Sequence, residues 1–484
     1  MGYSAQYDAV VVGSGPNGLA AAIAMQQAGL SVLLIEGADK IGGGLRTAEL
    51  TLPGFKHDVC SAVHPMAMAS PFFSTLSLHK YGLTYIDPKL PAAHPLDDGT
   101  AAVLYRSLLM TAEGLGTDKQ TYLDLVAPLV SDWDKLVGNL LSPLRFPRYP
   151  IAMARFGINA LQPAARIAKR FSTEKAKALW GGMAAHSIQP LSNLTTAAIG
   201  MVLSAVGHIH GWPIPQGGSE TIASALELYF VSLGGIVQTG FKVNNLNEIP
   251  QAKIILLDVT PKQLQDIAGD ELSKIYNWQL NNYRYGMGVF KIDWALSEVV
   301  PFTALDARDA GTIHLGNKFG EIEKSELYSS NGKVSTNPFV LMAQPSVFDP
   351  TRAPEGKHTA WAYCHVPAGS MTDMTTIIEN QVERFAPGFK DTIIAKHTLN
   401  TREIQAYNPN YIGGDINGGI QDIRQLYTRP VLSVSPYRTS KKGLYLCSSS
   451  TPPGGGVHGM CGYHAARQAL RDVFNIKISN LSST

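Results

Sequence analysis

Residues 8–22 read Asp8-Ala-Val-Val-Val-Gly13-Ser-Gly15-Pro-Asn-Gly18-Leu-Ala-Ala-Ala22. The apolar run at residues 7–12 predicts a buried parallel strand, and the Ala-rich stretch at 17–27 predicts a helix after it. Gly13 permits the tight turn between them, Gly15 lets the backbone approach a diphosphate, and Gly18 lets the helix pack closely on the strand. The helix N-terminus favours a phosphate anion. The stretch therefore predicts a dinucleotide-binding turn.

A second strand and an acid complete this unit. Residues 31–35 form another apolar run, and Glu36 follows it directly. Glu36 stands 21 residues beyond Gly15, where the carboxylate that binds a ribose hydroxyl belongs. An isolated glycine motif would be weak evidence. With strand, helix, strand and acid in order, an ordinary glycine-rich turn is much the poorer interpretation.

The residues after Glu36 bear on which dinucleotide is bound. They include Gly42-Gly43-Gly44-Leu45-Arg46. Glycines there add a second set of close backbone contacts, and Arg46 adds a cation for the diphosphate side. The pattern resembles the extended motif of FAD enzymes of the amine oxidase and phytoene desaturase superfamily. The alternative for Arg46, a solvated loop cation, stays open at this point.

A second glycine cluster lies near the other end of the chain. It reads Gly443-Leu-Tyr-Leu-Cys-Ser-Ser-Ser-Thr-Pro-Pro-Gly454-Gly-Gly456-Val-His-Gly-Met-Cys-Gly462. This pattern predicts a strand, a glycine-rich loop and a helix over about 457–474. The N-terminus of that helix would stabilise negative charge on a reduced flavin ring. The two clusters together predict one long cofactor held by both ends of the polypeptide.

The middle of the chain predicts a discontinuous layout. Residues 88–210 are mostly helical in pattern. Ser219 is expected to N-cap a helix that Gly234 and Gly235 close, and Gly217-Gly218 is either a plain loop or a second close approach to the cofactor. Alternating stretches at 285–294, 339–343 and 358–366 predict a mixed sheet. We expect an FAD-binding domain from residues 1–85, 211–282 and 425–484, and a substrate domain from 86–210 and 283–424.

Several motifs outside the two clusters carry a family resemblance. They are Pro215-Gln-Gly-Gly218, residues 285–294, residues 349–358 and Gly413-Gly-Asp-Ile-Asn-Gly-Gly419. With the two clusters they resemble the phytoene-desaturase-related flavoproteins, and most of all the group called pyridine nucleotide-disulfide oxidoreductase domain-containing protein 2. The resemblance spans nearly the whole chain. It implies an α/β fold with a Rossmann-like FAD-binding domain, of the glutathione reductase and amine oxidase superfamily type, and a discontinuous α+β substrate domain.

The resemblance also implies cofactor-binding residues. Gly13, Gly15 and Gly18 match the diphosphate turn, Glu36 the ribose acid, and Gly43, Gly44 and Arg46 the extended motif. Val243 matches a valine whose backbone binds adenine. The C-terminal motif, represented by Ser449, Gly455, Gly456 and Met460, matches the segment beside the flavin ring. Many relatives have an acid after the last strand, where this chain has Ser448 to Thr451, so hydroxyls or backbone amides must serve here.

The resemblance implies FAD as cofactor and a redox reaction. We expect hydride transfer from a C–H bond of an apolar, isoprenoid- or lipid-like substrate to flavin N5, which forms a carbon–carbon double bond. His64 and His458 are the candidate proton-transfer residues, although structural histidines are the more common case. Trp212 and Tyr463 are expected to be packing residues. One alternative is an amine oxidase-like enzyme with an aromatic cage, and another is a flavin-holding interaction protein with little turnover.

Composition restricts the other functions. Charged residues are 16% and the net charge is +2, so no global field favours nucleic acid. The four cysteines lack CxxC spacing, which argues against dithiol chemistry, and the scattered histidines predict no metal site. His208 and His210 are expected to be structural. Residues 1–7 show no leader, and no apolar run has the length of a membrane span. We expect a cytoplasmic protein, or by the resemblance a mitochondrial matrix protein if it is eukaryotic.

One segment suggests contact with a membrane. Between residues 145 and 177, apolar residues alternate with eight cations and the single acid Glu174. A basic amphipathic segment can lie on an anionic bilayer, which would suit a lipid-like substrate. A solvated helix face or a surface for a protein partner are the alternatives. The cations are Arg145, Arg148, Arg155, Arg166, Lys169, Arg170, Lys175 and Lys177.

Overall fold

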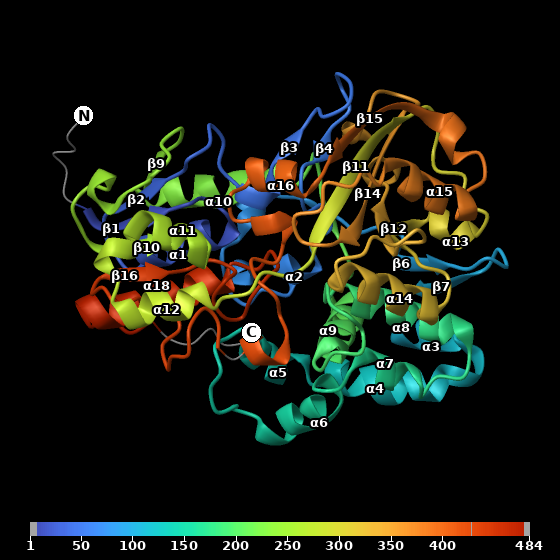
Figure 1. Cartoon of the computed structure of the whole chain (residues 1–484), viewed down its shortest axis with the longest axis horizontal. Helices are drawn as coiled ribbons and strands as arrows, with labels where there is room; N and C mark the ends of the chain where they lie inside the picture. Colours follow the sequence, from blue (N-terminus) through green and yellow to red (C-terminus); the bar gives the residue numbers. More distant parts are fainter. Residues whose placement is uncertain (1–6, 427, 479–484) are drawn as a thin grey trace.

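A computed structural model describes residues 7–426 and 428–478, so most of the N-terminal stretch examined for a leader lies outside it. Two sheets organise the chain (Figure 1). The first has five strands, and every pairing in it is parallel. Its order is β16 (Leu444–Leu446), β10 (Ala252–Leu257), β1 (Tyr7–Val12), β2 (Val32–Ile35) and β9 (Ile236–Gln238).

Helices from both ends of the chain cover this sheet. α1 (Pro16–Gln27) packs closely on α18 (Met460–Phe474), and α10 (Glu220–Ser232) lies against α1. A Cβ on Gly462 would come 1.8 Å from the Asn17 carbonyl oxygen, so glycine is required where α1 and α18 meet. The opposite face carries α11 (Pro261–Ala268) and α12 (Lys274–Asn281). Segments from the beginning, the middle and the end of the sequence thus build one dinucleotide-binding layer.

The second sheet has seven mixed strands. Apolar side chains on one of its faces form a separate core with α15 (Thr375–Phe385). The other face is turned toward the first sheet and carries polar and aromatic side chains, as two-residue alternation requires. Its order is β15 (Ile393–Leu399), β11 (Gly288–Leu296), β14 (His358–Val366), β13 (Val340–Ala343), β12 (Ala310–Leu315), β6 (Leu90–Pro95) and β7 (Ala101–Leu104).

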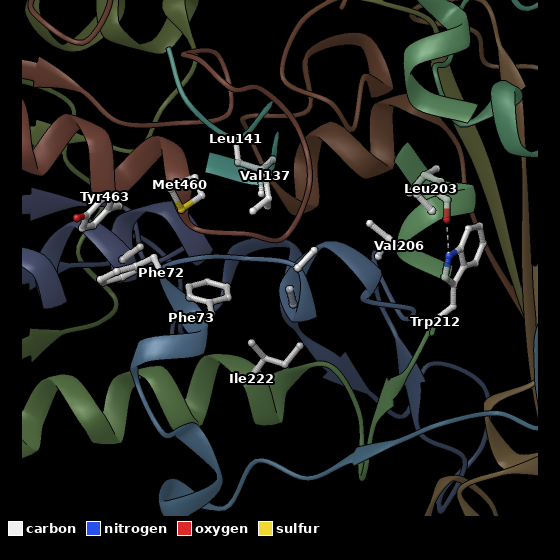
Figure 2. Packing of buried hydrophobic residues seen from close by; sticks show 14 of the residues in the cluster. Phe72, Phe73, Val137, Leu141, Leu203, Val206, Trp212, Ile222, Met460 and Tyr463 are labelled. Atoms are coloured by element: carbon white, nitrogen blue, oxygen red, sulfur yellow. Dashed lines mark hydrogen bonds between the residues drawn. The ribbon is translucent and has the colours of Figure 1, made fainter. Parts of the chain in front are cut away.

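Helices between residues 108 and 209 form a third layer. Figure 2 shows how buried residues of this layer, such as Val206, together with Trp212 just after it, continue the core that includes Phe72 and Met460. The helices are α3 (Leu108–Gly114), α4 (Lys119–Ser131), α5 (Trp133–Leu140), α6 (Pro150–Ala160), α7 (Ala164–Ala168), α8 (Glu174–Ala185) and α9 (Thr196–Ile209).

Short elements and the remaining helices connect these layers. Two-stranded pairs join β3 (Thr47–Ala48) to β4 (His57–Asp58) and β5 (Tyr85–Ile86) to β8 (Ile214–Pro215). The other α-helices are α2 (Pro65–Met68), α13 (Leu305–Arg308), α14 (Phe319–Ser330), α16 (Thr401–Tyr407) and α17 (Ile423–Leu426). The predicted α/β fold class is confirmed, with a mixed sheet beside the parallel one.

Three local predictions differ from the structure. β6 and β7 fall in the stretch expected to be helical, because Pro91 and Pro95 disguise a strand that pairing with β12 stabilises. Ser219 makes no capping hydrogen bond, since its hydroxyl donates to the Ser61 carbonyl instead. The last helix begins at Met460 rather than 457, after Gly459 takes a left-handed conformation with φ 67°.

Candidate functional site

A cavity of about 610 Å³ lies between the two sheets. Gly13 and Gly15 line it from the first glycine cluster, and Ser449 and Gly456 line it from the second. Side chains of β11, β12, β13 and β14 form its far wall. The two clusters and the mixed sheet therefore share one continuous space, as the sequence predicts for a long cofactor and a substrate.

The turn after β1 has the geometry expected for a diphosphate. Gly13 adopts φ +96°, and a Cβ on Gly18 would lie 1.9 Å from the Gly13 carbonyl oxygen. A Cβ on Gly15 would lie 2.8 Å from Asp258 Oδ2. Only glycine fits at positions 13 and 18 without strain or movement of backbone, and a side chain at position 15 would displace the buried Asp258 carboxylate. Gly18 packs against the Gly13 carbonyl oxygen at the start of the turn and does not itself line the cavity.

Glu36 and Arg46 lie together at the dinucleotide end. Glu36 Oε2 accepts hydrogen bonds from the Ser14 amide at 2.9 Å and the Ser14 hydroxyl at 2.5 Å. Glu36 Oε1 accepts from the Ala38 amide at 2.9 Å and from Arg46 Nη2 at 3.2 Å. The Arg46 guanidinium also lies 5.4 Å from the Tyr407 ring centroid. Arg46 is thus a cavity-lining, paired cation rather than a freely solvated one.

Residues 406–411 cover this end from the opposite side. The Tyr407 hydroxyl donates to the Gly43 carbonyl at 2.8 Å, and a Cβ on Gly44 would meet Tyr411 Oη at 2.3 Å. Asn410 Nδ2 donates to the Asp258 carbonyl oxygen at 3.0 Å. The sequence analysis assigns this segment to the substrate domain, and these contacts place it as a lid over the dinucleotide end. Val243 lines the same end of the cavity.

Asp258 is a cavity residue that the sequence reasoning missed. It follows β10, the neighbour of β1, and its Oδ2 accepts from the Gly18 amide at 2.9 Å. Burial raises its pKa to about 7, and the nearby Glu36 charge adds to the effect. The available signal was an acid directly after a buried parallel strand, at the sheet edge where ligands bind.

Anionic dinucleotide binding should depend on the proton of Asp258. A diphosphate over Gly15 repels the ionised carboxylate, so the protonated form binds it better. We expect the Kd for FAD to rise by up to about tenfold per pH unit above pH 7, and Asp258→Asn to flatten this slope. Fluorescence titration of FAD between pH 6 and 9 measures both. Glu227→Gln, a half-buried acid of raised pKa outside the cavity, is the matched control. An unchanged slope in Asp258→Asn would contradict the prediction.

His64 lines the cavity in its neutral form. Burial lowers its pKa to about 4. Its Nε2 lies 2.8 Å from the Ser219 hydroxyl, which donates to the Ser61 carbonyl at 2.6 Å. The Ser219 hydroxyl has only one proton, which it donates to Ser61, so it must accept the hydrogen bond from His64 Nε2–H. The neutral ring therefore has its proton on Nε2 and a free lone pair on Nδ1. Nδ1 is buried without a hydrogen-bond partner among the described residues.

The other predicted residues of the C-terminal cluster lie deeper. His458 does not line the cavity, and its Nδ1 accepts from the Met460 amide at 3.0 Å, so it secures the start of α18. Gly455 and Met460 are also outside the lining, which means that the loop of Gly456 and Val457, not the helix N-terminus, meets the cavity. The structure therefore gives His458 a structural position.

The serine run and Gly217-Gly218 have structural partners too. Ser450 Oγ donates to the Gly418 carbonyl at 2.7 Å, while Ser449 lines the cavity. A Cβ on Gly218 would meet Thr47 at 2.4 Å, and neither Gly217 nor Gly218 lines the cavity. Gly217-Gly218 is thus a loop before α10 and makes no second approach to the site.

The sheet wall contains a buried ion pair that the sequence reasoning also missed. Lys291 Nζ lies 2.5 Å from both carboxylate oxygens of Asp293, on the face of β11 that points toward the cavity. Burial alone would raise the pKa of Asp293, but the Lys291 ammonium lowers it below its ordinary value. His57 Nδ1 stands 3.6 Å from Asp293 Oδ1. The sequence pattern that could have predicted this pair is a lysine and an aspartate two residues apart, and so on the same face, in an otherwise apolar strand.

The far end of the cavity combines apolar and neutral polar groups. His186 Nε2 lies 2.9 Å from His314 Nε2, and burial lowers the pKa of His186 to about 3. Ile188 has φ +51°, a strained value for a β-branched residue, and Trp212 donates to the Leu203 carbonyl at 3.2 Å (Figure 2). Trp212 both packs and lines the cavity, whereas Tyr463 only packs, stacked on Phe72.

Other candidate chemistries receive no support from the described residues. The four cysteines among the described residues are free thiols. The same residues contain no group of three His, Cys, Asp or Glu side chains that could hold a metal ion. His208 is structural, bonded to the Tyr122 hydroxyl and the Tyr105 carbonyl. None of the helices in residues 7–426 and 428–478 combines the length and apolarity needed to cross a bilayer.

Comparisons with known proteins agree with this geometry. Residues 11–74 match the family described as NAD(P)-binding Rossmann-like domain. The rat protein called pyridine nucleotide-disulfide oxidoreductase domain-containing protein 2 is 27% identical over 97% of this chain and 94% of its own. The predicted resemblance is confirmed. The lycopene-forming phytoene desaturase of a Paracoccus strain is a more distant relative, 21% identical over 55% of this chain and 56% of its own.

The fold also has a solved counterpart. Putrescine oxidase bound to putrescine superposes with a TM-score of 0.62, covering 98% of this chain and 100% of that chain at 16% identity. This likeness shows the fold alone. Together, the family match, the curated relatives and the dinucleotide turn indicate an oxidoreductase with a dinucleotide cofactor, without indicating its substrate.

Proposed function

We propose that the protein is an FAD-dependent oxidoreductase that dehydrogenates a C–H bond of a largely apolar substrate. One observation carries the proposal: a single cavity connects the diphosphate turn, the Gly456 loop and the side-chain face of the mixed sheet. The lining of that space runs from the diphosphate turn to the sheet wall, so a long dinucleotide would reach from one to the other. The relationship to a phytoene desaturase, by its name an enzyme of dehydrogenation, supports the reaction class.

The residues present fit FAD. Gly13 and Gly15 suit the diphosphate, and a Cβ on Gly43 would come 3.0 Å from the Gly15 Cα, so two glycine backbones approach each other there. Glu36 and Arg46 offer a carboxylate and a guanidinium beside them. Val243 would contact the adenine end, and Ser449 and Gly456 the ring end. When bound, FAD supplies the acceptor for a hydride.

The protein's own groups would orient the substrate and exclude water. Leu341 and Leu399 give the sheet wall an apolar surface, and Val289 extends it. The neutral histidines His64 and His186 can accept or donate a hydrogen bond without adding charge to that surface. The one charge on this wall, Lys291, is neutralised by Asp293, and the other side chains that line the cavity from the sheet are uncharged, so the wall favours an uncharged substrate body.

The amine oxidase-like alternative requires an aromatic cage. Trp361 and Tyr363 do line the cavity, but their rings are parallel within 3° and their centroids are 5.8 Å apart. The two rings stack on each other along β14 and leave no gap for an amine between them. The dehydrogenase proposal therefore has the better support.

The test is spectroscopic. Purified protein should show the absorption bands of oxidised flavin, and extraction should release FAD. Under anaerobic conditions, isoprenoid hydrocarbons should bleach these bands, and primary amines of equal size should not. Absence of flavin, even after incubation with FAD, would overturn the proposal. Bleaching by amines alone would establish the oxidase alternative, and bound flavin that no compound reduces would favour the interaction protein.

His64 is the best candidate for proton transfer. We expect His64→Ala to lower kcat/KM by about 10²-fold or more with an unchanged flavin content, since it lines the cavity with an unpaired Nδ1. Because its pKa is lowered to about 4, its ionisation should not shape the rate between pH 6 and 8. Steady-state kinetics with the compound that bleaches the flavin provides the measurement. His79→Ala, on an exposed turn, is the control, and equal rates in both variants would exclude His64.

A further inference from the structure

The helix α6 has its apolar residues on the outside. It lies at the edge of the helical layer, away from both sheets (Figure 1). Ile151 is 79% exposed and Ile158 is 70% exposed, and of its eleven residues only Ala160 is buried. The preceding loop adds Phe146, which is 87% exposed. With Leu144, Tyr149 and Leu161 these exposed apolar side chains all lie within residues 144–161 and are named here the α6 patch.

The exposed residues of α6 are not the side of the helix that packs on the rest of the described protein. The opposite side of α6 already packs, since Ala152 and Phe156 line a small crevice together with Leu125 of α4 and Met201 of α9. A helix that packs with one side and exposes isoleucines on the other needs a partner outside the fold.

Cations surround the patch, and their charges identify the partner. Residues 135–173 contain seven Lys or Arg side chains and no acid. Arg155 forms an ion pair with Asp132, but within the described residues Arg148, Arg166 and Lys169 have no carboxylate within ion-pairing distance. Arg170 donates to Asn159 Oδ1 at 2.8 Å, which places the cations of residues 166–170 beside α6.

We propose that the α6 patch docks on an anionic lipid bilayer surface. Side chains such as Phe146 and Ile151 enter the boundary of the acyl chains, and the flanking cations contact anionic headgroups. A second copy of this chain would bring cations such as Arg148, Arg166 and Lys169, which have no carboxylate partner among the described residues, against the same cations, and this repulsion disfavours self-association. The charge pattern therefore favours a membrane.

The position of α9 gives the docking a consequence for the cavity. Met201 of α9 faces the crevice under α6, and Leu203 of the same helix lines the main cavity. The helix α9 thus contacts both the crevice beneath α6 and the main cavity. If the proposed function is right, docking places the cavity that takes the apolar substrate one helix, α9, away from the docked helix α6.

Vesicle sedimentation tests the proposal. The full-length protein should bind vesicles of phosphatidylcholine with phosphatidylglycerol, and not vesicles of phosphatidylcholine alone. Binding should weaken as salt rises from about 50 to 300 mM, because headgroup attraction is screened. The variant Phe146→Ser/Ile151→Ser/Ile158→Ser should lose at least about tenfold in affinity. Arg148→Gln/Arg166→Gln/Lys169→Gln should lose about fivefold for each cation removed.

A second exposed apolar pair provides the matched control. Ile275 and Trp278 on α12 are about as exposed as the α6 residues, but the acids Asp270 and Glu271 precede them. Ile275→Ser/Trp278→Ser should bind vesicles like the unaltered protein. Equal loss in this control, or no binding to anionic vesicles at low salt, would overturn the proposal. Concentration-dependent dimers that only the α6 variant abolishes would assign the patch to self-association instead. Vesicle binding is scored independently of flavin content, so its failure is distinct from failure of the proposed function.

Discussion

Gly18→Ala is expected to yield protein without bound flavin and with a markedly lower Tm. The added Cβ would lie 1.9 Å from the Gly13 carbonyl oxygen, and that atom belongs to backbone, which cannot rotate away. α1 must therefore move off β1, and the Gly18 amide then leaves Asp258 Oδ2. Overpacking of this kind costs about 3 kcal/mol, a large share of the stability of a typical domain. Flavin absorbance relative to protein and thermal unfolding measure the two effects.

Gly320→Ala is the matched control for Gly18→Ala. Gly320 also lies in the first turn of a helix, α14, and a Cβ there has no atom within 4 Å. The substitution should leave the flavin content unchanged and raise stability by up to about 1 kcal/mol, through helix propensity alone. Retention of full flavin by Gly18→Ala would show that the close contact of α1 with β1 does not matter for binding.

Lys291→Met should destabilise the protein by about 3–5 kcal/mol. The substitution leaves the Asp293 carboxylate fully buried without its cation. In the unaltered protein the pKa of Asp293 is lowered from its ordinary value of 3.8, so its ionised form stabilises the fold at pH values above 3.8. That contribution is lost as the pH falls below this value. In the variant the carboxylate is desolvated and has lost its ammonium partner, so its pKa rises, although His57 Nδ1 stays 3.6 Å from its Oδ1 and His397 Nδ1 3.9 Å from its Oδ2. The Tm difference between the two proteins should therefore narrow from pH 8 to pH 5.

The double variant Lys291→Met/Asp293→Asn distinguishes charge from packing. Removing both charges abolishes the unpaired ion, so more than half of the lost stability should return. His57, whose pKa burial lowers to about 4, stays neutral in both proteins at pH 7 and cannot supply the missing cation there. A double variant no more stable than the single one would mean that Lys291 matters for its aliphatic packing against the sheet wall.

Local patterns explain why much of the dinucleotide end was predictable. The turn of Gly13, Gly15 and Gly18 is specified within a few residues, because strand, turn and helix are consecutive in sequence. The strand of β14 was also readable from its two-residue alternation. In both places the hydrophobic pattern and the residues that the local backbone conformation requires predict the same structure.

Contacts between distant segments explain what the sequence could not show. Asp258 acquires its raised pKa only because β10 lies beside β1. The lid of Tyr407 and Tyr411 lies over Gly43 and Gly44 although hundreds of residues separate them. His458 stands in a conspicuous motif, yet its ring serves the start of α18. No periodicity or spacing encodes such pairings.

The placement of β16 and α18 also has a consequence for biosynthesis. β16 is the last strand of the parallel sheet, and α18 packs on α1, so both arrive from the end of the chain. Residues 444–457 must be synthesised before Gly456 can close the space that Gly13 opened. Until then a nascent chain keeps one edge of β10 unpaired. Capture of the cofactor would accordingly follow the synthesis of this late segment.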